Sequence, residues 1–128
     1  MSLIHEFAAE HRVRIRITST GEYLICGRPR DAVRPEDRNH VFENGDGRLG
    51  VCLLLGSVKR WNNAKRYLLA EGFELHQDGE TEGTLLFDPD DPCQADAAIR
   101  AAGIARRKNV SAETLAAATL RLNRMEAL

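Results

Sequence analysis

Arginine and aliphatic residues alternate in the segment HRVRIRIT, residues 11–18. Successive side chains of an extended strand point to opposite faces, so Arg12, Arg14 and Arg16 would share one face at intervals of about 6.5 to 7 Å. A guanidinium presents a planar fork of N–H donors that suits phosphate oxygens, and contact with a nucleic-acid backbone uses several cations at once. We therefore expect a phosphate-binding face. The alternative is a solvated face whose charge discourages edge-to-edge pairing.

A hairpin is expected to present this face. The turn signal Thr20-Gly21 separates the strand at 12–18 from a second strand at 22–27. With a two-residue connection, Tyr23 lies on the arginine face, where its ring could stack beside the guanidiniums. A three-residue connection would move Tyr23 to the core face. Tyr23 is counted among the expected binding residues on the basis of the two-residue pairing.

Further arginines follow in the proline-containing segment 28–39. Long loops frequently hold binding residues, and Arg28 and Arg30 would extend the basic surface. The same segment contains three acids. The alternative is therefore a surface loop neutralised by its own salt bridges.

A basic helix is predicted from Ser57, a suitable N-cap, to about Glu71. Its exposed positions carry residue types that contact phosphates and base edges. These are Lys59, Arg60, Asn62, Asn63 and Arg66. Trp61 falls on another side of the helix and is expected to enter the core.

Charge is unevenly distributed, although the net charge is −1. Residues 1–70 and 100–128 each carry an excess of four positive charges, whereas residues 71–99 contain nine acids and no Lys or Arg. Such an asymmetry of charge indicates which partners a protein can attract and does not indicate its fold. The acidic region 74–91 is typical of turn and helix-capping chemistry, and alternatively of a surface that addresses a basic protein partner.

A final Ala-rich helix is expected at 111–128, with a narrow apolar seam. Leu115, Ala118, Leu122 and Met125 recur at intervals of three and four residues. We expect this seam to dock on the domain. Pairing with a partner protein or a second copy through Leu115, Leu122 and Met125 is the alternative.

Catalytic patterns are not found in the sequence. The four histidines form no metalloprotease pattern, and the chain has neither a GxSxG motif nor a Walker loop. The three cysteines lack zinc-ligand spacing. We therefore expect a protein without enzymatic activity, cofactor or metal.

Membrane insertion is not expected, because no apolar run approaches the roughly 18 to 20 residues that a spanning helix needs. The N-terminus lacks the pattern of a signal peptide, so a cytoplasmic location follows by default. With 43% hydrophobic and 29% charged residues over 128 positions, the composition is that of a globular domain.

An α+β fold is predicted for a single domain, 1–128. Residues 1–48 would hold an N-terminal helix, an antiparallel hairpin and the arginine-rich loop, residues 49–110 the core, and residues 111–128 the C-terminal helix. The core follows the βαββα(β) order of a ferredoxin-like sheet. Its first strand, 49–55, would lie centrally and be covered on both faces.

The passage EGTLLFDPDDPCQADAAIRAAG, residues 82–103, resembles the third strand and second helix of an RNA-recognition motif. That family stacks bases on aromatic residues of its two central strands. The corresponding strands here offer VCL (51–53) and LLF (85–87), so base stacking on the sheet is not expected. The closing strand of the core would be 105–109.

We therefore expect a small non-enzymatic protein that binds a nucleic-acid backbone through the arginine strand and the basic helix. The alternative is a protein-interaction module or inhibitor that uses the acidic region 74–91 or the C-terminal seam.

Overall fold

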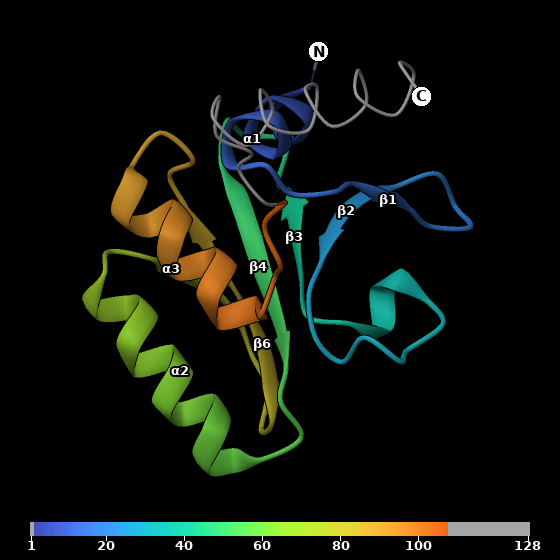
Figure 1. Ribbon diagram of the computed structural model, residues 1–128. Coiled ribbons are helices and arrows are strands. Elements are labelled where there is room, and N and C mark those ends of the chain that lie inside the picture. The colour runs from blue at the N-terminus through green and yellow to red at the C-terminus, as the bar shows by residue number, and fades with distance from the viewer. Residues whose placement is uncertain (1, 108–128) are drawn as a thin grey trace, which may run out of the picture.

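The computed structural model describes residues 2–107, which form three α-helices, one short 3-10 helix and six strands (Figure 1). The helices are α1 (Leu3–His11), α2 (Val58–Ala70), α3 (Pro92–Ala102) and the 3-10 helix η1 (Pro35–Asp37). The strands are β1 (Arg16–Ile17), β2 (Tyr23–Cys26), β3 (His40–Glu43), β4 (Leu49–Leu54), β5 (Glu74–Asp78) and β6 (Glu82–Phe87). None of these helices is long and apolar enough to cross a bilayer. The helix predicted at 111–128, with its seam, lies outside the described residues.

One antiparallel sheet contains all six strands, in the order β1-β2-β3-β4-β6-β5. The three α-helices pack on one face of this sheet (Figure 1). Ile25, Val41, Val51 and Leu85 pair in a row across that face, and none of their side chains is exposed. Burial of such aliphatic rows stabilises the fold through the hydrophobic effect. The predicted α+β class is confirmed.

Helix ends follow local capping signals that the sequence contains. Ser57 Oγ accepts a hydrogen bond from the Arg60 amide at 3.3 Å, and Asp91 accepts two from amides of the first turn of α3. Gly103 ends α3 with φ 69°, in the left-handed region that glycine adopts without steric cost. The chain therefore turns sharply after α3 and runs back toward the N-terminal half of the sheet (Figure 1).

The strand predicted at 12–18 is much shorter in the structure. Arg12 ends α1 in the left-handed conformation, with φ 57°, and only Arg16 and Ile17 form β1. The exposed arginines of this segment still alternate with the buried Val13 and the half-buried Ile15, but most of the segment is not a strand. Arg12, Arg14 and Arg16 therefore do not form one regular row on a strand face.

The predicted pairing of the hairpin is wrong. Arg16 pairs with Leu24, so the connection between the paired backbones contains three residues, 19–21, rather than two. Tyr23 consequently lies on the opposite face from Arg16. Its ring packs edge-on against the His5 ring of α1, with centroids 4.6 Å apart.

Strand β4 lies between β3 and β6, so its predicted central position is confirmed. The predicted coverage of both faces of β4 is not confirmed. On one face Leu49, Val51 and Leu53 are buried under the helices, whereas on the other face Cys52 and Leu54 are half-buried. The order β4, α2, β5, β6, α3 occurs as predicted. Residues 104–107 form no strand, and β3 is the second neighbour of β4.

Candidate functional site

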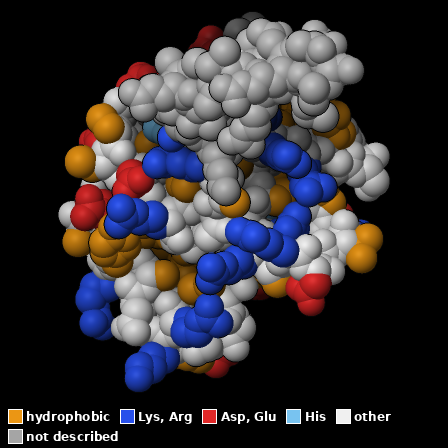
Figure 2. Space-filling view, viewed as in Figure 1, with side chains coloured by type: hydrophobic (Ala, Val, Ile, Leu, Met, Phe, Trp, Pro, Cys, Tyr) orange, Lys and Arg blue, Asp and Glu red, His pale blue; other side chains and the backbone are white. Residues whose placement is uncertain are grey.

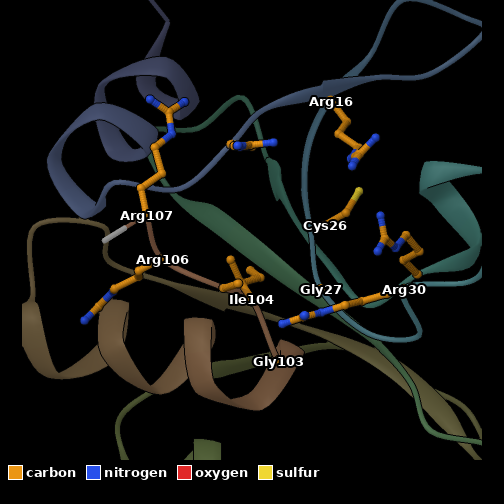
Figure 3. A pocket seen from close by; sticks show the side chains of 11 residues that line it. Arg16, Cys26, Gly27, Arg30, Gly103, Ile104, Arg106 and Arg107 are labelled. Carbon is orange, nitrogen blue, oxygen red and sulfur yellow. The ribbon is translucent and has the colours of Figure 1, made fainter. Parts of the chain in front are cut away.

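A cavity of about 330 Å³ lies where the β1–β2 hairpin, the loop before β3 and the segment after α3 meet (Figure 3). We call it the arginine pocket. Six arginines line it, namely Arg14, Arg16, Arg30, Arg38, Arg106 and Arg107. Cys26, Gly27, Gly103, Ile104 and Ala105 complete the lining, so no acidic side chain of residues 2–107 takes part in it. The pocket is therefore strongly positive.

The close approach of β2 to the end of α3 builds the floor of the pocket. The Arg28 amide donates to the Ala102 carbonyl oxygen at 3.0 Å, and the Gly27 amide donates to the Asn39 carbonyl oxygen at 2.7 Å. A Cβ at Gly27 would overlap the Ala102 carbonyl oxygen. Glycine at this position therefore allows the two segments to meet.

The segment after Gly103 brings two further arginines to the rim. Ile104 is 9% exposed and belongs to the hydrophobic core, which anchors the segment. The Arg107 amide donates to the Arg12 carbonyl oxygen at 2.7 Å, which ties the segment to the end of α1. The pocket thus joins the N-terminal part of the chain to the segment that follows the last described helix.

Most of the pocket's positive charge is not neutralised by protein. Arg106 pairs with Asp96 of α3 at 3.3 Å, and Arg38 Nε donates to the Pro29 carbonyl oxygen at 3.0 Å. The four remaining arginines of the pocket make no ion pair with any described residue. They are Arg14, Arg16, Arg30 and Arg107. Cations held together without carboxylates create a strong positive potential, which attracts anions.

Cys26 lies inside the arginine pocket, with Arg16 turned toward it (Figure 3). Its thiol also contacts the Pro35 carbonyl oxygen at 3.5 Å. Burial raises the pKa of the Cys26 thiol, while the positive charges of Arg38 and Arg16 act in the opposite direction. A thiol with a raised pKa is a poor nucleophile at neutral pH.

Two neighbouring cavities extend the basic surface beyond the pocket. One shares Arg30 and Arg106 with it and adds Arg28 and Arg100, although Asp96 pairs with Arg100 at 3.0 Å. The other shares Arg107 and adds Arg12 beside α1. We call Arg12, Arg28 and Arg100 the flanking arginines. Figure 2 shows Lys and Arg side chains in an arc across the centre of this face.

The residues predicted from the strand and the loop divide into three groups. Arg14, Arg16 and Arg30 line the arginine pocket, and Arg12 and Arg28 are flanking arginines. Tyr23 lies on another face, as the hairpin pairing requires. The structure therefore brings most of the predicted arginines together, without the aromatic ring.

The predicted residues of the basic helix lie elsewhere. Lys59, Arg60, Asn62, Asn63 and Arg66 are exposed on α2, and none of them lines the arginine pocket. Trp61 is fully buried, as predicted. The strand side and the helix side are therefore two separate basic surfaces rather than one.

Three pocket arginines were not among the predicted site residues. Arg38 lies in the arginine-containing loop 28–39, and Arg106 and Arg107 lie in the segment predicted as a strand. The signal that could have found the latter pair is the run ARRK, residues 105–108, which begins two positions after the helix-ending Gly103. Because Gly103 ends the helix, arginines that follow it closely are expected at a defined position and not in a free tail.

The acidic region 74–91 has structural partners for several of its carboxylates. Asp78 accepts hydrogen bonds from Trp61 Nε1 at 2.9 Å and from Lys65 Nζ at 3.0 Å, which lower the pKa of its carboxyl group. Asp88 accepts a hydrogen bond within its own turn, and Asp91 caps α3. Turn and capping chemistry thus explains Asp88 and Asp91, whereas Asp78 is held by contacts with α2.

Metal-binding geometry is not present in the described part of the chain. No three His, Cys, Asp or Glu side chains of residues 2–107 gather in a way that could hold an ion. Comparison of the chain with protein-family models, with curated proteins and with solved structures finds no match. Function is therefore inferred from the geometry of the arginine pocket.

Proposed function

We propose that this protein binds nucleic acid through the arginine pocket and the flanking arginines, without catalysing a reaction. The observation that carries the proposal is the convergence of six arginines from three chain segments on one cavity that no described carboxylate lines, with only Arg106 paired to an acid. Neutralisation of phosphates by such a cluster releases counterions, which drives nucleic-acid binding.

The pocket is suited to phosphate and sugar rather than to bases. A bidentate guanidinium matches two phosphate oxygens, and the described lining contains no aromatic residue on which a base could stack. Contacts of this kind position a nucleic-acid strand without reading its sequence. We therefore expect binding with little sequence preference.

A catalytic step is not part of the proposal. Apart from arginine, the titratable side chain in the lining is Cys26, whose raised pKa keeps the thiol protonated at neutral pH. Hydrolysis of a phosphodiester needs a general base, a nucleophile or a metal near the phosphorus. The pocket residues offer positioning and charge only.

Fluorescence anisotropy with labelled single-stranded DNA and RNA tests the proposal, with salt as the variable. The double variant Arg16→Glu/Arg30→Glu should weaken binding by at least about tenfold for each reversed charge. It should also reduce the slope of log affinity against log salt by about one for each phosphate that the protein no longer neutralises. The matched control is Lys59→Glu/Arg66→Glu, which reverses two exposed charges of α2 and should change affinity little.

Two outcomes would contradict this assignment. An equal loss of affinity in the α2 variant would place the strand on the basic helix and not in the pocket. Absence of binding to DNA and to RNA at low salt would contradict nucleic-acid binding altogether.

A protein partner is the second candidate, and one feature of the sheet favours it. All five residues of β5 are exposed, and one edge of this strand is unpaired within the described residues. Exposed strand edges can pair with a strand of another chain. A shift in size-exclusion chromatography on mixing with a basic protein, abolished by Leu75→Pro, would support it.

The arrangement of the strands and helices that carry these surfaces is also a proposal. We propose that β4, α2, β5, β6 and α3 form a ferredoxin-like unit, because β6 lies between β4 and β5 and is antiparallel to both. The described residues contain no strand after α3 to close such a unit.

A further inference from the structure

We infer that the arginine pocket receives the terminal phosphate of a nucleic-acid strand, while the flanking arginines contact the phosphodiesters that follow it. The inference rests on the proposed function and adds which part of the strand enters the cavity. Three observations carry it: the shape of the pocket, its density of charge and its rigid backbone.

Shape favours a strand end over a continuous strand. The pocket is a hollow whose floor is formed by Gly27, Gly103 and the buried Ile104, with arginines around it (Figure 3). Its volume of about 330 Å³ is near the lower limit of cavities that hold small ligands. A phosphoryl group with its sugar fits such a space. A strand that continued in both directions would have to enter and leave the same small hollow.

Charge density favours a phosphomonoester over a phosphodiester. A monoester carries a charge of about −1.5 to −2 at pH 7 and three acceptor oxygens, whereas each backbone phosphodiester carries one charge. Arg14, Arg16 and Arg30 have no carboxylate partner in the described residues. Arg38 adds a fourth guanidinium near Cys26. Four forks of donors around one cavity match three oxygens that each accept more than one hydrogen bond.

The backbone around the pocket is fixed before any ligand binds. The Gly27–Asn39 and Arg28–Ala102 hydrogen bonds join β2, β3 and α3, and the Asn39 amide donates back to the Arg28 carbonyl oxygen at 2.7 Å. Arg107 is tied to Arg12 in the same way. The arginines are therefore attached to a preorganised frame, which reduces the entropy lost on binding.

The flanking arginines give the rest of the strand a path. Arg28 and Arg100 border one neighbouring cavity and Arg12 borders the second, so a strand whose end fills the pocket can continue along one of the two. Asp96 lines the cavity that Arg28 and Arg100 border, whereas no described acid lines the pocket, so the positive charge is greater in the pocket than along that side. The highest charge thus coincides with the position proposed for the most highly charged group of the ligand.

The test compares oligonucleotides of one sequence that differ only at their ends. The probes are a single-stranded oligonucleotide with a 5′-phosphate, the same strand with a 3′-phosphate, and the strand with hydroxyl groups at both ends, each measured by competition against the labelled strand. We expect the strand with one of the two terminal phosphates to bind about tenfold or more tightly than the hydroxyl strand. The 5′ and 3′ arms show which end enters the pocket.

Variants then assign the preference to the pocket. Arg16→Gln and Arg30→Gln should reduce the ratio between phosphorylated and hydroxyl strands toward one, while the matched control Arg66→Gln should retain it. Both pocket arginines are exposed, so the fold should be unaffected, and fluorescence of the buried Trp61 checks this.

The outcomes separate this inference from the proposed function. Equal affinity for phosphorylated and hydroxyl strands would overturn the inference and leave nucleic-acid binding in place. Absence of binding to every strand would overturn both. A nucleoside monophosphate that binds as tightly as the phosphorylated strand would also overturn both, because the ligand would then be a small phosphate ester.

Discussion

The two edges of the sheet differ in whether their cationic side chains are paired with carboxylates. Beside β5, cations meet carboxylates: Lys65 Nζ lies 3.0 Å from Asp78 Oδ2, and Arg48 pairs with both Asp46 and Glu74. At the other edge, beside β1, arginines are gathered around a cavity that no described carboxylate lines. These cations are therefore paired with carboxylates at one edge, whereas the six pocket arginines at the other edge, apart from Arg106, have no ion-pair partner among the described residues.

This difference separates charge that supports the fold from charge that is available to a ligand. Paired charges beside β5 fix α2 to the sheet, since Asp78 also accepts the Trp61 indole N–H. Unpaired arginines repel one another, so the core and the backbone frame must hold them together. Departures from local consistency of this kind are expected at functional sites. If the two edges divide in this way, changes at each edge should have separable effects on stability and on binding.

The largest effect is expected at the glycines on which each edge depends. A Cβ at Gly27 would overlap the Ala102 carbonyl oxygen, and a Cβ at Gly83 would overlap the Trp61 ring and the Gln77 carbonyl oxygen. Gly27→Ala and Gly83→Ala should each lower the free energy of unfolding by about 1–3 kcal/mol, as overpacking usually does. Urea denaturation measures this loss.

Binding should distinguish these two variants. Gly27→Ala separates β2 from α3 and should weaken nucleic-acid binding, whereas Gly83→Ala disturbs the packing of β6 against Trp61 of α2 and Gln77 of β5 and should leave the affinity unchanged in the folded protein. Equal affinities in the two variants would show that the frame around Gly27 does not shape the binding site.

Acid pH should act on the pocket side of the sheet first. His40 begins β3 opposite Cys26 of the pocket, its Nδ1 lies 2.7 Å from the Arg38 carbonyl oxygen, and burial lowers its pKa below 6.5. The unfolded chain therefore takes up a proton at a higher pH than the folded chain, and stability present above pH 6.5 is lost as the pH falls through the folded pKa. Burial lowers the pKa of His11 in the same direction.

Urea denaturation at about pH 7.5 and about pH 5.5, on either side of the ordinary histidine pKa, measures this loss. His40→Gln and His11→Gln should each remove part of the difference between the two conditions. Unchanged stability of the original protein between these pH values would contradict the burial of neutral histidines.

Removal of a pocket arginine should cost little stability. Arg16→Gln and Arg30→Gln delete exposed side chains without ion-pair partners in the described residues, so the free energy of unfolding should stay within about 0.5 kcal/mol of the original. A slight gain is expected at low salt, because repulsion between the arginines is reduced. Urea denaturation at low and high salt measures both effects. A loss above about 1 kcal/mol would show that these arginines are structural rather than free for a ligand.

Local signals made much of the fold predictable. Ser57, Asp91 with Pro92, and Gly103 mark helix ends by their own chemistry, and the structure places the ends there. The hairpin pairing failed because Thr20-Gly21 does not specify whether two or three residues form the connection, and one residue reverses every face.

The site was predictable only in part, for a different reason. Residue type alone indicates that Arg14, Arg16 and Arg30 can bind phosphate. Their meeting with Arg106 depends on the contact between Gly27 and Ala102, which lie 75 positions apart. Neither periodicity nor spacing reports such a tertiary contact, so the sequence did not place Arg38, Arg106 and Arg107 beside the predicted arginines.

The smallest effect is expected at the exposed, neutralised edge, where it should be local. Hydrogen bonds from Arg48, with a further one from Asn44, lower the pKa of Asp46 from 3.8 to about 2. The carboxylate thus contributes stability above pH 3.8 that is lost as the pH falls through about 2, well below the range in which the histidines titrate. NMR titration of Asp46 measures this directly, and Arg48→Gln should return its pKa toward 3.8, with Asp78 as the unaffected control. If Asp46 titrates near 3.8 in the original protein, its charge is not held by Arg48, and the contrast between the two edges of the sheet loses one of its supports.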